Sequence, residues 1–131
     1  MRRADWPERL AAYINGREAV AFAWGPNDCC SFAAGAVLAL TGDDPMRALR
    51  RRYRSARGAT RLLNEQTLES HLDERFARVG VAMAHRGDVA LVEIEGRPSV
   101  AIVEGEMLVA PGLNGLVRVP RGLAVGAWRV G

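Results

Sequence analysis

The spacing of apolar positions in the first half of the chain is that of helices. Over residues 4–16 the large apolar side chains recur every three or four positions and a glycine closes the run, which predicts one amphipathic helix. Residues 28–41 are small or apolar almost throughout, and a helix that is apolar on all sides is typical of a buried, central position. Asp43 and Asp44, followed by Pro45, predict the start of a third helix.

The second half of the chain changes to the period of strands. Residues 58–64 and 67–76 still predict one or two short helices. After them come β-favouring runs at residues 89–92, 100–103, 107–110, 116–119 and 127–130. Turns that contain glycine or proline are expected at residues 96–98, 105, 111–112 and 120–122. Helices followed by a strand meander predict an α+β fold, with the central helix packed on an antiparallel sheet.

Length and composition fit one domain that spans residues 1–131. With 131 residues, of which 49% are apolar, the chain is long enough to bury a core of its own. It contains no apolar run of about 18 residues, so no membrane span is expected. Residues 1–20 lack the charged segment followed by an apolar segment and a small-residue cleavage site that make up a signal peptide, so we expect synthesis in the cytoplasm.

The cysteines and histidines exclude a structural metal or a disulfide framework. Cys29 and Cys30 are adjacent, and neighbouring cysteines form at best a strained disulfide, which agrees with a reducing compartment. His71 and His85 are far from them in sequence and fit no zinc-binding spacing. We therefore expect neither a metal nor another cofactor.

The basic residues are weak evidence for a nucleic-acid partner. All 18 are arginine and none is lysine, which is more typical of GC-rich coding than of selection for contacts with phosphate. The net charge is only +3, so we expect no nucleic acid to be bound. The arginine-rich stretch 47–61 offers a candidate basic surface, although such a run is more often a solvated helix face. The residues of that surface would be Arg47, Arg50, Arg51 and Arg54.

The dipeptide Asp28-Cys29 is the motif that points most directly to chemistry. It follows a Trp24-Gly25 turn and opens the expected central helix. A thiol in the first turn of a helix feels the positive end of the helix dipole, which favours the thiolate over the thiol. The alternative is that Cys29 and Cys30 are packing residues, because free cysteine is commonly buried.

Five short motifs, in order, resemble those of the NlpC-type cell-wall peptidases, a papain-like family, and above all the short versions that phages and prophages encode beside tail genes. They are Phe22-Ala23-Trp24-Gly25, Asp28-Cys29-Cys30-Ser31-Phe32, Arg86-Gly87-Asp88-Val89, Ser99-Val100-Ala101-Ile102-Val103-Glu104-Gly105 and Met107-Leu108-Val109-Ala110-Pro111. The resemblance covers residues 22–111. It implies a papain-like fold with a cleft lined by Phe22, Trp24 and Asp28, unless the two aromatic residues belong to the core.

The same resemblance shows which catalytic groups this chain lacks. Cys29 matches the family's nucleophile, but Ser99 takes the place of the histidine base and Val109 that of the polar residue that orients it. Phe22 replaces a tyrosine near the nucleophile. A serine hydroxyl is too weak a base near pH 7, so we expect amide hydrolysis to be lost and Cys29 to titrate as an ordinary thiol, near pH 8.5.

Neither histidine offers an evident substitute for the missing base. His85 precedes the first strand of the expected hairpin, about 17–20 Å from Ser99 at about 3.3 Å per residue. His71 lies in a polar helical segment that the sequence gives no reason to place near Cys29.

The resemblance thus implies a catalytically inactive domain that serves as a structural or binding component of a phage or prophage tail, or of an assembly that faces the cell wall. Its partners would be other tail proteins or peptidoglycan, and it would leave the cell inside a phage-like particle. The alternative is an active cysteine hydrolase, a peptidoglycan endopeptidase or amidase, in which an unrecognised base serves Cys29. A nucleic-acid-associated protein that uses the arginine-rich stretch ranks last, because the sequence contains no recognised nucleic-acid-binding motif.

Overall fold

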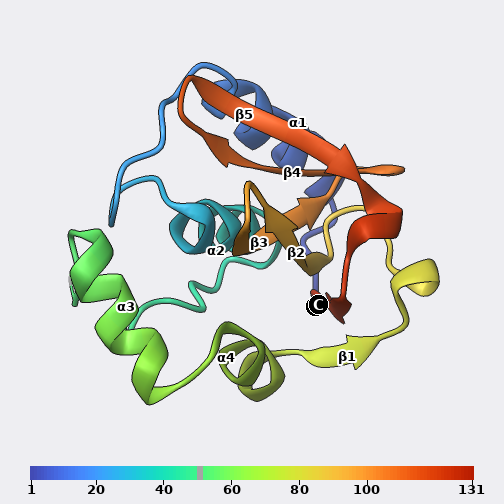
Figure 1. Ribbon diagram of the computed structural model, residues 1–131. Coiled ribbons are helices and arrows are strands. Elements are labelled where there is room, and N and C mark those ends of the chain that lie inside the picture. Colours follow the sequence, from blue (N-terminus) through green and yellow to red (C-terminus); the bar gives the residue numbers. More distant parts are fainter. Residues whose placement is uncertain (50–51) are drawn as a thin grey trace.

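The computed structural model describes residues 1–49 and 52–131 and shows an α+β protein (Figure 1). Over these residues the helices are α1 (Trp6–Arg17), α2 (Cys29–Thr41), α3 (Ala56–Glu65) and α4 (Leu68–Arg75), with short 3-10 turns η1 (Val81–Met83) and η2 (Arg121–Leu123). The strands are β1 (Ala77–Val79), β2 (Val89–Ile94), β3 (Arg97–Val103), β4 (Met107–Gly112), β5 (Gly115–Pro120) and β6 (Gly126–Arg129). They form an antiparallel sheet in the order β1-β6-β2-β3-β4-β5.

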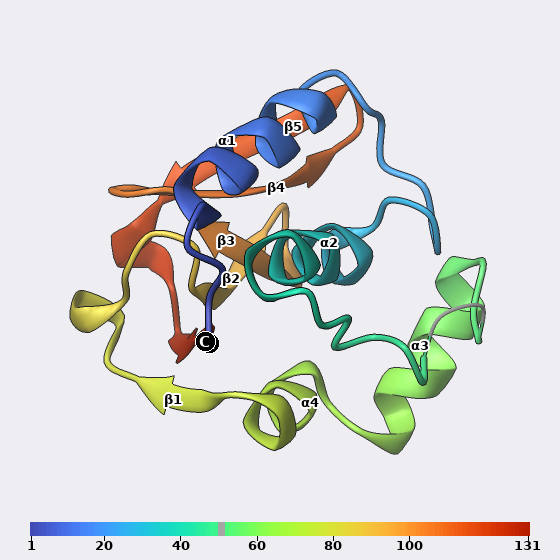
Figure 2. The same ribbon diagram turned by 180° about the vertical axis from the view of Figure 1, so that it is seen from behind.

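The central helix predicted over residues 28–41 is confirmed as α2. Asp28 caps it and forms a reciprocal capping box with Ser31, and Gly42 ends it in the left-handed conformation with φ of 85°. The helix is apolar on nearly every side because it is enclosed: it packs on α1 and on strands β3 and β4. Figures 1 and 2 show α1 beyond α2 on one side, along β4 and β5, and α3 and α4 together on the other side.

Helix α1 approaches α2 closely because Gly35 has no side chain. Tyr13 of α1 lies over Gly35 and donates its hydroxyl proton to the carbonyl oxygen of Phe32, at 2.8 Å. A Cβ atom placed on Gly35 would lie 2.7 Å from Cζ of Tyr13. Leu10 and Ile14, on the same side of α1, are buried in the core. The small residue therefore sets the distance between the two helices.

The sheet is apolar on both faces. In the β2–β3 hairpin Val89 lies opposite Ile102 and Val92 opposite Ser99. Successive strand residues point to opposite faces, so the register separates two sets of side chains. The set that packs with α2 includes Val89, Leu91, Val100, Ile102 and Trp128. The set on the other face includes Ala90, Val92, Ala101, Val103 and Ala127.

The third helix expected after Asp43 and Asp44 does not form over residues 43–49, so that prediction is wrong. The chain makes consecutive turns instead, in which the Asp44 carboxylate accepts the N–H of Met46 and the Asp44 carbonyl accepts the N–H of Arg47. An aspartate that bonds its neighbouring backbone offers the chain an alternative to a helix. The two later helices do form, as α3 and α4, with Ser55 and Thr67 as their caps.

All five expected strands form, but two of the expected turns are displaced. The turn between β2 and β3 is Glu95-Gly96, with φ of 52° and 75°, a two-residue hairpin loop that fits the twist of the strands. Arg97 and Pro98 were expected in that turn and are instead paired in β3. Pro111-Gly112 likewise lies within β4. The three-residue strand β1, which pairs with β6 at the edge of the sheet, has no counterpart among the predicted strands.

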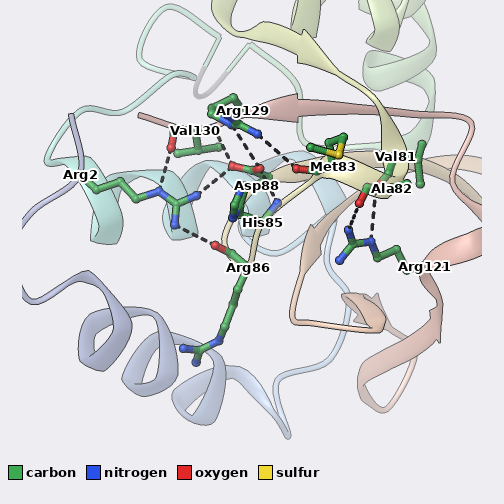
Figure 3. Close-up of polar contacts among 10 residues, drawn as sticks. All are labelled: Arg2, Val81, Ala82, Met83, His85, Arg86, Asp88, Arg121, Arg129 and Val130. Atoms are coloured by element: carbon green, nitrogen blue, oxygen red, sulfur yellow. Dashed lines mark hydrogen bonds and ion pairs between the residues drawn. The ribbon is translucent and has the colours of Figure 1, made fainter.

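A buried carboxylate joins the two ends of the chain to the start of β2 (Figure 3). Asp88 is fully buried, and its Oδ1 accepts hydrogen bonds from Nη2 of Arg2 at 2.8 Å and from the N–H of Val130 at 3.0 Å. Its Oδ2 accepts the N–H of His85 at 2.8 Å. Arg2 also donates to the carbonyl oxygens of Arg86 and Val130, both at 2.8 Å. We call Arg2, Asp88 and Val130 the terminal clamp.

Over the described ranges 1–49 and 52–131, none of the helices has the length and apolar character needed to cross a membrane.

Candidate functional site

The site begins at the N-terminus of α2, where Asp28 organises the chain around Cys29. One carboxylate oxygen of Asp28 accepts the N–H of Ser31, at 2.9 Å. The other accepts the N–H of Gly25 at 2.9 Å and the hydroxyl proton of Tyr53 at 2.6 Å. Gly25 has φ of 89°, a value that side chains other than glycine rarely allow. Cys29 therefore occupies the first position of a helix whose start is fixed from three directions.

Tyr53 is a site residue that the sequence did not reveal. Its hydroxyl covers the capping carboxylate, and burial together with the hydrogen bond to Asp28 raises the pKa of Tyr53 far above its ordinary value. The two residues are 25 positions apart, and Tyr53 follows the arginine run that was expected to be helical. The only signal in the sequence was an aromatic residue within a polar, arginine-rich segment.

Cys29 and Cys30 form a pair of free, half-buried thiols. Their sulfur atoms lie 3.9 Å apart, within the range of an S–H···S hydrogen bond. The Cys30 thiol and the backbone N–H of Val100 both stabilise the Cys29 thiolate, so the pKa of Cys29 is lowered despite its burial. The pKa of Cys30 is raised well above its ordinary value, because it keeps the proton that the pair shares. The expectation of an ordinary thiol at Cys29 overlooked these two donors.

Both thiols line a cavity of about 800 Å³ between the body of the protein and the arm formed by α3 and α4. Its walls come from α2, α3, α4 and the strands β2 and β3. The aliphatic lining includes Ala33, Ala34, Val37, Ala59, Leu62, Leu63, Leu68, Leu72, Val89, Leu91 and Val100. The volume and the apolar lining are those of sites that bind small molecules.

The two aromatic residues of the Trp-Gly turn also line this cavity. Phe22 and Trp24 pack edge to face, with ring centroids 4.9 Å apart, and both are half-buried. The guanidinium of Arg97 lies over the Trp24 ring, 5.6 Å from its centroid. Asp28 contributes to the wall as well. The residues expected to line a cleft are thus brought together with Cys29.

Ser99 reaches the cavity wall, but its side chain belongs to the other face of the sheet. It lies directly opposite Val92, which packs in the cluster away from α2. The Ser99 hydroxyl donates to the carbonyl oxygen of Arg97, at 3.2 Å. The β3 residue whose side chain faces α2 is Val100. Val109 is fully buried among the aliphatic residues packed on α2. Ser99, Val100 and Val109 therefore offer Cys29 no general base.

The two histidines occupy different environments. His85 is exposed in the loop before β2, and its backbone N–H donates to Asp88. His71 lines the same cavity as Cys29, which the sequence did not predict. Burial and the nearby Arg75 lower the pKa of His71, so its ring is neutral near pH 7. Its Nδ1 lies 3.2 Å from Nη1 of Arg75.

The basic surface expected around residue 50 can be described only in part. Arg47 and Arg54 are exposed. Arg50 and Arg51 lie outside the described residues. Within residues 1–49 and 52–131 no group of three or more acidic, histidine or cysteine residues is arranged to hold a metal ion.

The fold and this site define an α+β protein with a paired thiol at the start of its central helix, facing an apolar cavity. A family model described as "Domain of unknown function (DUF6950)" matches residues 1–130, and the protein belongs to this family. Comparison with curated proteins gives no match.

Proposed function

We propose that this protein is a non-hydrolytic relative of the NlpC-type papain-like peptidases, acting as a structural or binding component of a phage or prophage tail or of an assembly that faces the cell wall. The observation that carries the proposal is the side chain opposite the nucleophile. Where a papain-like enzyme needs an imidazole, β3 turns Val100 toward α2, and the Ser99 hydroxyl lies on the other face. On this proposal, the thiol at the start of α2 is what remains of a catalytic site that has lost its base.

Amide hydrolysis requires more than a thiolate. The leaving amine must take up a proton as the C–N bond breaks, and in this class a nearby acid, usually histidine, supplies it. The Cys30 thiol holds its proton too strongly for that role, since its pKa is raised well above the ordinary value. Tyr53 also holds its proton strongly, because burial and its hydrogen bond to the Asp28 carboxylate raise its pKa. The acidic groups next to Cys29 are therefore poor proton donors.

His71 is a poor substitute for the missing base. Arginine can only donate hydrogen bonds, so Nδ1 of His71 must accept from Arg75 and the neutral ring carries its proton on Nε2. The lone pair that could remove a proton from a substrate is then already used. Among the hydrogen bonds of the described residues, none joins His71 or His85 to Cys29.

An active cysteine hydrolase is the second candidate, and the lowered pKa of Cys29 favours it. The two candidates differ in a direct assay on purified peptidoglycan and on muropeptides with intact stem peptides. The non-hydrolytic proposal predicts that wild type and Cys29→Ala release no fragments, as measured by chromatography and mass spectrometry. Turnover by the wild type that disappears in Cys29→Ala would make the protein an enzyme.

A binding assay tests the positive part of the proposal. If the protein faces the cell wall, the wild type should sediment together with insoluble peptidoglycan and be retained in the pellet. Trp24→Ala removes an aromatic wall of the cavity, and we expect it to weaken retention. Leu113→Ala is the matched control, because Leu113 is exposed and does not line the cavity. Equal loss from both variants would argue against binding through this site.

A further inference from the structure

We propose that the cavity holds a medium- or long-chain acyl group and that Cys29 accepts this group from an acyl thioester. Each protein molecule would accept one acyl group as a thioester on Cys29. The acyl group then stays bound, so no hydrolysis step is needed. The inference goes beyond the proposed function and does not depend on the protein belonging to a phage tail.

The shape and lining of the cavity favour an alkyl chain. A volume of about 800 Å³ lies within the range of small-molecule sites. The wall that α3 and α4 form has an aliphatic part, made of Ala59, Leu62, Leu63, Leu68 and Leu72, and a polar part that includes Thr60, Glu69, His71 and Arg75. An alkyl chain gains free energy for each methylene group that it removes from water, so the aliphatic part of the wall favours an acyl chain.

The thiol that would carry the acyl group is in place at the opposite wall. Cys29 lines the cavity at the start of α2, where the helix dipole favours a negative charge. The Cys30 sulfur, 3.9 Å away, and the N–H of Val100 both stabilise the thiolate. A nucleophile is thus available without a neighbouring base.

The missing acid limits Cys29 to substrates whose leaving group departs as a stable anion. An amine cannot do so near neutral pH, but a thiolate can. In the step that we propose, the Cys29 thiol first loses its proton to solvent. Its sulfur then attacks the thioester carbonyl carbon, a new C–S bond forms, and the C–S bond to the carrier breaks. The carrier leaves as a thiolate and takes up a proton from solvent, so one thioester replaces another with no oxidation or reduction.

The test incubates the full chain with one of two small thioesters, S-acetyl-N-acetylcysteamine or S-octanoyl-N-acetylcysteamine. Mass spectrometry of the intact protein and of its peptides measures the transfer. We expect one acyl group per molecule, attached to Cys29 and released by hydroxylamine. Octanoyl transfer should be at least about tenfold faster than acetyl transfer, because the longer chain buries more methylene groups against the aliphatic wall. Cys29→Ser should abolish the label, and Cys30→Ser should keep it on residue 29, because a serine hydroxyl can still donate to the thiolate.

Two cavity variants separate chain recognition from thiol reactivity. Ala59→Phe takes up space beside α3 and should slow octanoyl transfer more than acetyl transfer, so that the octanoyl-to-acetyl ratio falls. Leu63→Ser changes a lining residue that is 37% exposed, so it tolerates substitution if Ala59→Phe does not fold, and it should lower the octanoyl-to-acetyl ratio. Absence of the acyl label, a label on Cys30, or equal rates for the two thioesters would each overturn the inference. None of these results bears on peptidoglycan cleavage or retention, so the two proposals fail separately.

Discussion

Cys29 and Cys30 differ by one position in the sequence, yet the structure gives them opposite tendencies to ionise. The Cys29 thiolate receives hydrogen bonds from the Cys30 thiol and from the N–H of Val100, and Cys30 retains its proton. Reactivity toward an alkylating reagent follows the thiolate fraction, so the two residues should be distinguishable by pH alone.

We expect the alkylation rate of Cys29 by iodoacetamide to have its midpoint below pH 8.5, the ordinary value for cysteine. Cys30→Ala removes the S–H donor and should move that midpoint upward, whereas Cys30→Ser should hold it nearer to that of the wild type. Peptide mass spectrometry after quenching at each pH gives the rate for each residue. A midpoint at or above 8.5 in the wild type would contradict this account of the pair.

Tyr53 links stability to pH in a direction that can be worked out. Its pKa is raised in the folded protein, while in the unfolded chain it is about 10. The hydrogen bond to Asp28 therefore contributes its full stability below about pH 10, and that contribution is lost as pH rises further, because only the unfolded state then releases the proton.

Tyr53→Phe should lower the free energy of unfolding by about 1.5–3 kcal/mol at pH 7, the range for a hydrogen bond to a charged group. It should also reduce the fall in stability between pH 9 and 11. Urea denaturation followed by tryptophan fluorescence measures both effects. Tyr13→Phe is the control, because the Tyr13 hydroxyl donates to a neutral carbonyl. An equal pH dependence in wild type and Tyr53→Phe would show that another group is responsible.

At the scale of elements, the packing of α1 on α2 depends on one missing side chain. Alanine is a better helix former than glycine by about 1 kcal/mol, so a Gly→Ala change inside a helix normally stabilises it. At Gly35 the added Cβ would meet the ring of Tyr13, which is held by its hydrogen bond to Phe32. The steric conflict opposes the gain in helix propensity.

We therefore expect Gly35→Ala to destabilise the protein by about 1–3 kcal/mol, the usual effect of overpacking a core. Gly16→Ala, within α1, meets no atom within 4 Å and should instead stabilise it by about 0.5–1 kcal/mol. Thermal unfolding of the two variants beside the wild type gives the comparison. The same sign for both substitutions would mean that helix propensity, and not the contact with Tyr13, decides the result.

The helices and strands that could be predicted from the sequence are those whose formation is specified by residues within or next to the element itself. The apolar run and its Asp28 cap specify α2, and short β-favouring runs specify the strands. The turns after Asp43 were missed because the competing hydrogen bonds of Asp44 give no periodic pattern. The orientation of Ser99 could not be deduced either: β3 is apolar on both faces, so its alternation does not show which side meets α2.

At the scale of the whole molecule, the site depends on contacts between distant parts of the sequence. Tyr53 reaches Asp28 from the segment before α3, and His71 reaches the cavity wall because α4 lies beside α2 (Figure 2). Cys29, Phe22 and Trp24 could be predicted as neighbours because they are close in sequence. The cavity itself could not, since its far wall comes from helices whose placement no local pattern fixes.

The terminal clamp carries a large share of the stability of the whole molecule. Asp88 is fully buried, so Asp88→Ala removes the carboxylate partner of the partly buried Arg2 and leaves the N–H groups of His85 and Val130 without their acceptor. Removing one partner of a buried ion pair costs about 3–5 kcal/mol. We expect a loss of that size in urea denaturation. Asp5→Ala breaks only the exposed pair with Arg9 and should change stability far less. Similar losses for the two variants would refute a central role for the clamp.

The clamp also makes folding during translation depend on β6. Arg2 precedes its carbonyl partner in Val130 by 128 positions. During translation α1 and α2 can emerge and pair, but the hydrogen-bond network of Arg2 and Asp88 closes only once Val130 has emerged. A ribosome that stalls before β6 therefore leaves one edge of β2 without its partner strand and the core without Trp128 and Val130.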